Sequence, residues 1–266
     1  MVPRILTIAG SDSGGGAGIQ ADLKTITALG GFGMSAVTAL TAQNTVGVRA
    51  VYAVSPDFVA AQIDAVAEDI GVDAAKTGML ATGPIIEVVA DRVKRHAIRP
   101  LVVDPVMAAK SGDALLKPDA VAVLSGSLLP LAAVVTPNLA EAERLTGVPA
   151  RDRAGMRETA RRLLDLGPQW ALVKGGHLPG DPVDVLYDGR DFYEIVRPRV
   201  RTASTHGTGC TYASAIATGL GRGMAVPAAV EWARDALQAA LEGALALGHG
   251  AGPLDHAAMF PFAARA

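Results

Sequence analysis

The turn Ser204-Thr205-His206-Gly207-Thr208-Gly209-Cys210-Thr211 stands directly before a run of small residues from Tyr212 to Leu220. Its two glycines allow turn conformations that point several backbone N–H groups at one spot. The run that follows has helical composition, which places these amides at a helix N-terminus, where an anion is favoured. The turn also holds the only cysteine of the chain. It predicts a reaction centre that binds an oxyanion or phosphate beside a thiol of lowered pKa. The alternative is a tight strand-to-helix connection with a buried cysteine.

Strand-like runs alternate with helix-like runs along the rest of the chain. Strands are predicted at residues 4–9, 34–40, 48–54, 73–76, 101–104, 132–136, 171–174, 183–187 and 192–196, and helices at 17–29, 56–68, 83–96, 139–145, 156–166, 208–221 and 227–247. This alternation predicts an α/β fold, a three-layer sandwich in which helices cover both faces of a mostly parallel central sheet. The last two strands predict a small hairpin at the sheet edge. No linker or repeat divides the chain, so residues 1–266 are predicted to form a single domain.

The composition excludes several classes of protein. Half of the residues are hydrophobic and 19% are charged, which argues against disorder. The formal charge is −2 and the basic residues are dispersed, so no nucleic-acid partner is expected. A single cysteine excludes an internal disulfide and indicates a reducing compartment. No apolar run reaches the roughly 18 residues of a membrane span, so no membrane partner is expected and the predicted location is cytoplasmic.

The segments after the predicted strands are the candidate site, because ligands of open parallel sheets bind beyond the carboxyl ends of the strands. These segments are Gly10–Gly16, Thr41–Asn44, Lys76–Met79, Asp104–Met107, Thr136–Glu141 and Lys174–His177. Each of them places a polar or charged side chain next to glycine or proline. If they converge with the glycine-rich turn, they supply the parts that hold Mg²⁺ and nucleotide phosphates.

Structural interpretations compete with functional ones for most of these residues. The segment Gly14-Gly15-Gly16-Ala17-Gly18 does not match a P-loop and is weak support for a dinucleotide site. Asp104 can cap a turn, and Asn138 with Glu141 matches a capping box at a helix start. Lys174 is harder to explain as structure, because a lysine near the interior of a sheet is costly without an anionic partner.

A set of segments, taken together and in order, carries a resemblance to a known family. They are Ala9–Lys24, Thr41–Thr45, Lys76–Leu80, Asp104–Val106, Lys110–Gly112, Thr136–Asn138, Lys174–His177, His206–Thr211 and Gly248–Gly250. They resemble the hydroxymethylpyrimidine/phosphomethylpyrimidine kinases of thiamin biosynthesis, which belong to the ribokinase-like superfamily. The match runs from about Ile5 to His256, and the combination of the Gly-Thr-Gly-Cys turn with the Gly-Ile-Gln-Ala-Asp opening is specific. Ser204 stands where relatives often carry asparagine.

The resemblance implies two ATP-dependent steps, in which 4-amino-5-hydroxymethyl-2-methylpyrimidine is converted to its monophosphate and the monophosphate to the diphosphate. Gln43 would hydrogen-bond the pyrimidine edge, since an amide offers a donor and an acceptor together. Asp22 and the backbone near Gly10 and Val106 would complete the substrate pocket. A homodimer is also implied.

The same resemblance implies how ATP and its Mg²⁺ are held. Lys174 and Asn138 would contact the ATP phosphates, with Asp104 beside them. Asp104 and Glu141 would hold Mg²⁺, directly or through water. Oxygen ligands of this kind suit a hard cation.

For the transfer step, the resemblance implies that the backbone amides of Gly207, Thr208 and Gly209 form an anion hole for the phosphoryl group as it is transferred. Cys210 takes the place where many sugar kinases of the superfamily carry an aspartate base. It would accept the proton of the substrate hydroxyl, with a pKa lowered by the helix N-terminus.

Three other functions remain open from the sequence. A pyridoxal kinase would act on a ring of similar size. A thiol enzyme would use Cys210 as nucleophile and His206 as base, and would leave Lys174 and Asp104 without a purpose. A non-catalytic pyrimidine or pyridoxal sensor would have no need of the residues that favour phosphoryl transfer.

Overall fold

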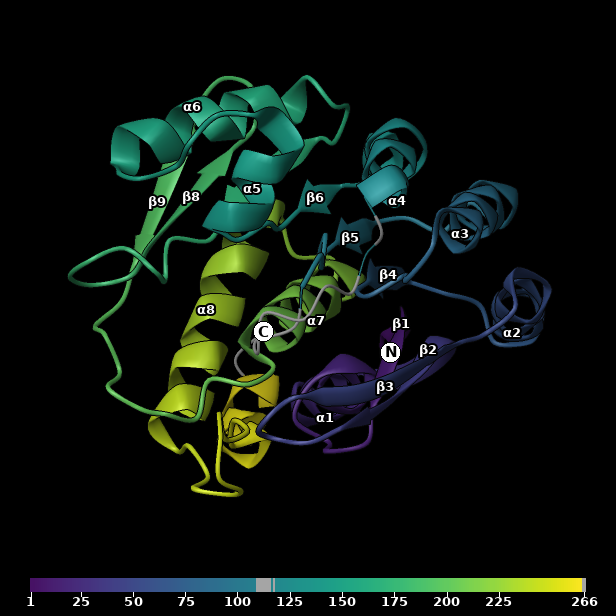
Figure 1. Ribbon diagram of the computed structural model, residues 1–266, viewed down its shortest axis with the longest axis horizontal. Helices are drawn as coiled ribbons and strands as arrows, with labels where there is room; N and C mark the ends of the chain where they lie inside the picture. The colour runs from purple at the N-terminus through teal and green to yellow at the C-terminus, as the bar shows by residue number, and fades with distance from the viewer. Residues whose placement is uncertain (109–115, 117, 265–266) are drawn as a thin grey trace.

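The protein is built on one nine-stranded sheet, with the strand order β3-β2-β1-β4-β5-β6-β7-β8-β9 (Figure 1). The strands are β1 (Arg4–Asp12), β2 (Phe32–Gln43), β3 (Val48–Ala53), β4 (Ala74–Thr77), β5 (Leu101–Val103), β6 (Val134–Val135), β7 (Trp170–Val173), β8 (Val183–Tyr187) and β9 (Phe192–Val196). The computed structural model describes residues 1–108, 116 and 118–264, so the sequence motif Lys110–Gly112 lies outside the described residues.

The sheet is parallel in its centre and antiparallel at both edges. Strands β2, β1, β4, β5, β6 and β7 pair in parallel, which confirms the predicted mostly parallel sheet. The predicted edge hairpin is also confirmed, since β8 pairs antiparallel with β7 and with β9. The second antiparallel edge, where β3 pairs with β2, was not predicted. Its cause is the short connection 44–47, in which Asn44 Oδ1 accepts the N–H groups of Val46 and Gly47 and turns the chain back.

Helices cover both faces of the sheet (Figure 1), as the sequence predicts. They are α1 (Gly18–Ala28), α2 (Pro56–Asp69), α3 (Gly83–Arg95), α4 (Pro118–Val123), α5 (Leu139–Thr146), α6 (Arg153–Leu164), α7 (Thr208–Gly221) and α8 (Val226–Glu242), with a π-helical turn η1 (Leu124–Leu128) and 3₁₀ segments η2 (Leu129–Leu131) and η3 (His256–Ala264). Helices α1, α7 and α8 pack on one face, and α2 to α6 pack on the other. Successive side chains of β1 point to opposite faces of the sheet. Ile5 packs with α1, α7 and α8, whereas Leu6 and Ile8 pack with α2 to α6.

Two helical features differ from the prediction. The last long helix ends at Glu242 rather than at residue 247, because Gly243 follows it and the chain turns there. The segments α4, η1, η2 and η3 were not predicted. Helix α4 is only one and a half turns long, and η3 contains Pro261, so neither carries the long apolar period that marks a helix in a sequence.

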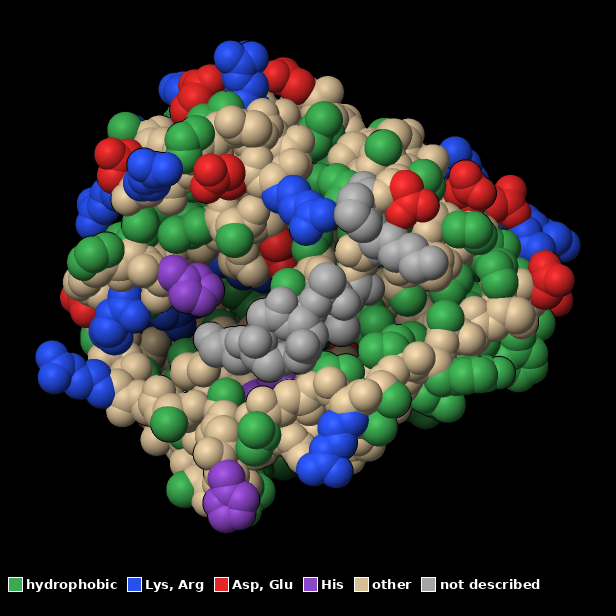
Figure 2. Space-filling view, viewed as in Figure 1, with side chains coloured by type: hydrophobic (Ala, Val, Ile, Leu, Met, Phe, Trp, Pro, Cys, Tyr) green, Lys and Arg blue, Asp and Glu red, His purple; other side chains and the backbone are tan. Residues whose placement is uncertain are grey.

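The surface in Figure 2 carries charges of both signs side by side along its upper rim, over α6. In that helix Arg161 and Arg162 both pair with Glu158. Apolar side chains gather instead at the right edge, over β3 and α2, where Val51, Tyr52 and Phe58 are exposed. Among the residues that the structure describes, no helix has the length and apolar character that crossing a bilayer requires.

Candidate active site

A cavity of about 650 Å³ opens at the carboxyl ends of the parallel strands. The cavity is lined by the carboxyl ends of six strands, β1, β2, β4, β5, β6 and β7, or by the segments that follow them. The start of α7 adds to the same lining. Its lining includes Gly10, Asp12, Gln43, Met79, Asp104, Val106, Met107, Asn138, Glu141, Lys174, His206, Gly207, Thr208, Gly209 and Cys210. The structure therefore brings together every residue of the predicted site except Asp22.

Lys174 and Asp104 form an ion pair on the cavity wall. Lys174 Nζ lies 2.8 Å from Asp104 Oδ1, and Thr136 Oγ1 donates to the same carboxylate oxygen at 3.3 Å. Burial by itself would lower the pKa of Lys174, but the neighbouring carboxylates of Asp104 and Glu141 outweigh it and raise that pKa. The lysine is therefore charged, and its side chain stays 14% exposed toward the cavity. Such a cation can meet the phosphates of a nucleotide.

Asn138 and Glu141 begin helix α5 and line the cavity at the same time. Asn138 Oδ1 accepts the N–H of Glu141 at 3.0 Å, and Glu141 Oε2 accepts the N–H of Asn138 at 2.8 Å. This is the capping box that the sequence pattern predicts. The structural and functional interpretations of these two residues are thus compatible, because the cap fixes them beside the ion pair.

The carboxyl of Glu141 has a pKa raised to about 7. Burial is the largest cause; Lys174 opposes it, and the nearby Asp104 adds to it. Asp104 and Glu141 together offer carboxylate oxygens on one wall. This donor set fits Mg²⁺, which is commonly held by one or two carboxylates together with substrate phosphates.

The glycine-rich turn becomes the N-terminus of helix α7, as its composition predicts. Gly207 precedes the helix with a φ of 82°, in the left-handed region that favours glycine. A Cβ atom on Gly209 would lie 3.3 Å from Lys174 Nζ and 3.4 Å from Asp104 Oδ2. The first turn of α7 therefore faces the Lys174–Asp104 pair, where its N–H groups can bind an anion.

The expected low pKa of Cys210 is wrong for this structure. Burial raises the pKa of the thiol to about 11, with added contributions from Asp22 and Asp104, and the opposing effect of Lys76 is too small to compensate. The helix N-terminus was visible in the sequence, whereas the two buried carboxylates near the thiol were not.

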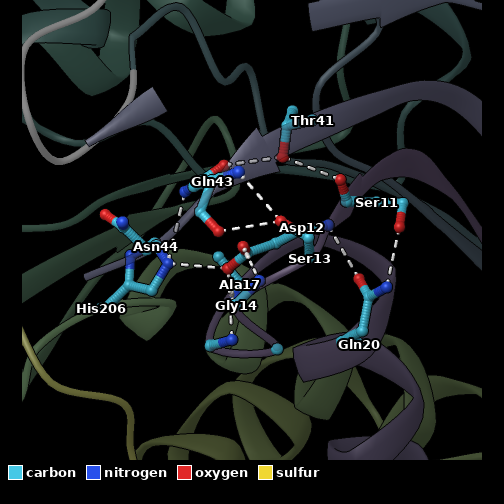
Figure 3. A network of polar contacts seen from close by, with 12 residues as sticks. Ser11, Asp12, Ser13, Gly14, Ala17, Gln20, Thr41, Gln43, Asn44 and His206 are labelled. Atoms are coloured by element: carbon cyan, nitrogen blue, oxygen red, sulfur yellow. Dashed lines mark hydrogen bonds and ion pairs between the residues drawn. The ribbon is translucent and has the colours of Figure 1, made fainter. Parts of the chain in front are cut away.

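Gln43 belongs to a network of polar contacts around Asp12 (Figure 3). Thr41 Oγ1 donates to Gln43 Oε1 at 3.0 Å, and Gln43 Nε2 lies 3.4 Å from His206 Nε2. His206 Nε2 in turn lies 2.8 Å from Asp12 Oδ2. This nitrogen is directed at a carboxylate and not at a thiol, which weakens the alternative of a thiol enzyme with His206 as its base.

Asp12 and the pairing of His206 were missed by reasoning from the sequence. The only signal was the position of Asp12 ahead of three glycines, a pattern typical of an aspartate that binds the backbone of its own turn. The partner His206 is 194 residues away, and no local pattern indicates that contact.

Asp22 is not brought to the cavity wall. Its side chain is fully buried below the site, where it pairs with Lys76 at 3.0 Å and accepts hydrogen bonds from Thr7 and Ser214 at 2.6 and 2.8 Å. The expectation that Asp22 completes the substrate pocket is corrected accordingly, because its oxygens are already satisfied inside the protein. Lys76, also fully buried, was not predicted as its partner.

Comparisons with known proteins show which family the chain resembles. The sequence model of the phosphomethylpyrimidine kinase family matches residues 12–255. A hydroxymethylpyrimidine/phosphomethylpyrimidine kinase of Streptomyces coelicolor is 50% identical, covering 96% of this chain and 94% of that protein. The thiamine biosynthesis bifunctional protein ThiED of Geobacter sulfurreducens is 54% identical over 95% of this chain, which spans only 52% of that longer protein.

Solved structures of the same fold include a Bacillus subtilis pyridoxal kinase in complex with ADP, with a TM-score of 0.91, 39% identity and coverage of 97% of this chain and 98% of that one. A phosphomethylpyrimidine kinase of Clostridium difficile has a TM-score of 0.80 and 44% identity, covering 89% of this chain and 98% of that one. The predicted ribokinase-like fold and the predicted enzyme class, an ATP-dependent phosphotransferase, are confirmed. With half of its residues shared with curated relatives over nearly its whole length, the chain belongs to the phosphomethylpyrimidine kinase family.

Proposed function

We propose that this protein carries out two phosphoryl transfers of thiamine biosynthesis. The first moves the γ-phosphoryl group of ATP to the hydroxymethyl oxygen of 4-amino-5-hydroxymethyl-2-methylpyrimidine, and the second moves another to the phosphate of that product. The observation that carries the proposal is the shared cavity, in which the Lys174–Asp104 pair and the N-terminus of α7 lie in one lining with Gln43. Family membership supports the choice of substrate.

Gln43 recognises the aminopyrimidine in this proposal. Its amide can accept a hydrogen bond from the ring amino group and donate one to the adjacent ring nitrogen. The hydroxyl of Thr41 lies 3.0 Å from both Gln43 Oε1 and the carbonyl oxygen of Ser11, and when it donates to Gln43 it orients the amide. The apolar side chains of Val106, Met79 and Met107 line the same cavity and offer surface for the ring and its methyl group.

Phosphoryl transfer relies on charge and position rather than on a covalent intermediate. Lys174 meets the phosphates as a cation, and Asn138 donates its side-chain N–H groups beside it. Asp104 and Glu141 would hold Mg²⁺, which when bound neutralises phosphate charge during transfer. The N–H groups of Gly207, Thr208 and Gly209 then stabilise the negative charge that develops on the transferred group.

Cys210 receives the proton of the substrate hydroxyl in this proposal. Its pKa of about 11 means that the thiol is protonated at neutral pH, so the thiolate is a minor species before substrate binds. The buried cation of Lys76 is the group that favours the thiolate. Because positioning and electrostatics dominate this type of reaction, a base with an unfavourable pKa still permits useful turnover.

Product analysis by mass spectrometry tests the proposal. The pure protein is incubated with hydroxymethylpyrimidine and MgATP, and a Lys174→Met variant serves as a control for contaminating kinases. The expected result is a monophosphate that appears first and a diphosphate that follows it, both absent with the variant. Monophosphate alone would restrict the function to the first step, and the absence of either product from folded protein would contradict it.

Pyridoxal phosphorylation is the second candidate, favoured by the TM-score of 0.91 with a pyridoxal kinase. A parallel incubation with pyridoxal distinguishes the two, because the better substrate has the higher kcat/KM. A non-catalytic sensor predicts no phosphorylated product from either compound, together with measurable binding.

We further propose a homodimer in the cytoplasm, as expected from the family resemblance and from the single cysteine. Sedimentation equilibrium of the pure protein measures the first of these. A mass of one chain at micromolar concentration would contradict it.

A further inference from the structure

The carboxylate of Asp12 bonds to two glycine-rich loops. One is its own loop, which contains Gly14, Gly16 and Ala17, and the other is the loop that contains His206 and Gly207. Oδ1 accepts the N–H of Gly14 at 2.8 Å, and Oδ2 accepts the N–H groups of Gly16 and Ala17 at 3.2 and 2.9 Å. The same Oδ2 lies 2.8 Å from His206 Nε2 (Figure 3). Asp12 is only 3% exposed, so in the intact site these protein donors, and not water, satisfy its carboxylate.

The carboxylate of Asp12 is ionised at neutral pH. Burial would raise its pKa, but hydrogen bonds from His206, Gly14 and Ala17 outweigh this and lower it. A charged acceptor makes each of these bonds stronger than a neutral pair would be.

The two loops that Asp12 joins are in direct contact. A Cβ atom on Gly16 would lie 2.5 Å from the Cδ2 atom of His206, and a Cβ atom on Gly207 would lie 1.9 Å from the carbonyl oxygen of Gly16. No side chain fits between them at either point. A movement of His206 is therefore transmitted to Gly207, which is the residue that starts the anion hole.

Gln43 is held by the same loop. The Oγ atom of Ser13 accepts the N–H of Gln43 at 2.9 Å and donates to the carbonyl of Gln43 at 2.8 Å. The side-chain amide of Gln43 lies next to His206, with its Nε2 atom 3.4 Å from His206 Nε2. The residue expected to recognise the pyrimidine and the loop expected to bind the phosphoryl group are thus both in contact with the Asp12–His206 pair.

We propose that Asp12 and His206 are positioning residues that hold the amide of Gln43 and the N–H groups of Gly207, Thr208 and Gly209 in one fixed relation, so that a bound pyrimidine places its hydroxyl in line with the phosphoryl group. This inference rests on the proposed function. Neither residue exchanges a proton with the substrate in this role; what matters is the bond from the ring nitrogen to the carboxylate. An enzyme site held this way loses rate when the geometry loosens by a fraction of an ångström.

Two substitutions of His206 form a matched pair. In glutamine the side-chain N–H₂ stands the same number of bonds from Cα as Nε2 of histidine, so His206→Gln keeps a donor for Asp12. In His206→Asn the donor is one bond shorter and the carboxylate is left without its partner. We expect His206→Asn to lower kcat about 10-fold or more and to raise the KM for the pyrimidine, on the scale of a misplaced site. The KM for ATP should stay within about twofold, since Lys174 and Asn138 are unaffected.

His206→Gln should keep kcat and the KM for the pyrimidine much closer to the wild-type values than His206→Asn does. If the imidazole itself were required, the two variants would lose equally. Asp12→Asn should resemble His206→Asn, because an amide NH₂ then faces N–H donors. Ser13→Ala, at an exposed side chain, should raise the KM for the pyrimidine with kcat unchanged. His256→Gln is the control for loss of a buried histidine elsewhere, since His256 bonds Thr211 Oγ1 at 3.0 Å and does not line the cavity.

Steady-state kinetics of these variants, with thermal unfolding to confirm folding, decides the question. Equal losses in His206→Gln and His206→Asn, parallel changes in the KM for ATP, or wild-type kinetics in His206→Asn and Asp12→Asn would each overturn the positioning role while leaving the proposed function intact. A Ser13→Ala variant that loses as much kcat as His206→Asn would overturn it as well. Wild-type protein that phosphorylates no pyrimidine would overturn the proposed function and this inference with it.

Discussion

Two lysine–aspartate pairs lie near the carboxyl ends of the parallel strands, and they differ in what surrounds them. Lys174 and Asp104 meet at 2.8 Å with exposed fractions of 14% and 2% for their side chains. Lys76 and Asp22 meet at 3.0 Å, and both are completely buried. The first pair lines the cavity, whereas the second lies beneath it.

The hydrogen bonds of the two carboxylates explain the difference. Both oxygens of Asp22 are used, because Lys76 lies 3.0 Å from each, Thr7 donates to Oδ2 and Ser214 donates to Oδ1. The bonds described for Asp104 are both on Oδ1, and its Oδ2 lies toward Gly209. A buried lysine therefore indicates a functional site only when its partner still faces a cavity; a saturated pair joins elements of the fold.

The sharpest test of this distinction is Lys76→Met. It leaves the charge of Asp22 without a counter-ion in the interior, and we expect a loss of about 3–5 kcal/mol in the free energy of unfolding. Urea denaturation measures this loss. The double variant Lys76→Met with Asp22→Asn should recover part of it, because the buried charge is then removed; a double variant as unstable as the single one would contradict the interpretation.

Lys174→Met should affect turnover more than stability. We expect kcat to fall by about 10²–10³-fold, the scale of one lost donor to a developing negative charge. The free energy of unfolding should fall less than in Lys76→Met, because truncation opens Asp104 to the cavity. Steady-state kinetics and urea denaturation of the same preparation test both statements, and a stability loss equal to that of Lys76→Met would make the two pairs equivalent.

The pKa of Cys210 depends on charges from both pairs, since Lys76 lowers it while Asp22 and Asp104 raise it. Cys210→Ala should lower kcat by about 10²-fold, the usual scale for a positioned base. Unchanged turnover would remove Cys210 from the mechanism.

The thiol also has a predicted effect on stability at alkaline pH. Its folded pKa is raised from 9.0 to about 11, so the folded state favours the protonated form. This contribution to stability is present below pH 9 and is lost as the pH rises through 11. Thermal unfolding of wild type and Cys210→Ser at pH 8 and pH 11 should show a larger decrease for wild type.

The smallest expected effect concerns Glu141, beside the first pair. Its carboxyl has a pKa of about 7, so it binds Mg²⁺ poorly when protonated below that pH. The Mg²⁺ concentration needed for half-maximal rate should therefore fall as the pH rises from 6 to 8. Glu141→Gln should abolish this pH dependence while keeping the helix cap, because glutamine also serves at that position. A pH dependence that persists in the variant would assign it to another group.

The fold and the cavity wall were largely predictable because their signals are local. Strand ends that carry Asp104 or Lys174 follow apolar runs, and the cap at Asn138 spans three residues. The partners of Asp22 were not predictable, since Lys76 and Ser214 are 54 and 192 residues away from it in the chain. The raised pKa of Cys210 was not predictable either, because its largest cause is the burial of the thiol, and the carboxylates of Asp22 and Asp104 that add to it are brought close only by the fold. Local sequence patterns identify the ends of elements; they do not identify which buried charges meet.

The capping box at Asn138 separates the demands of folding from those of catalysis. Its Oδ1 atom accepts the N–H of Glu141, so its side-chain N–H groups are the part that can meet a nucleotide phosphate. Aspartate begins a helix as well as asparagine does. A population of sequences selected only for a folded protein would therefore contain both residues at this position. Selection for use of ATP would retain asparagine alone, because aspartate would place a negative charge against the phosphates. If Asn138 contacts ATP as proposed, natural variation at residue 138 would record nucleotide binding rather than stability.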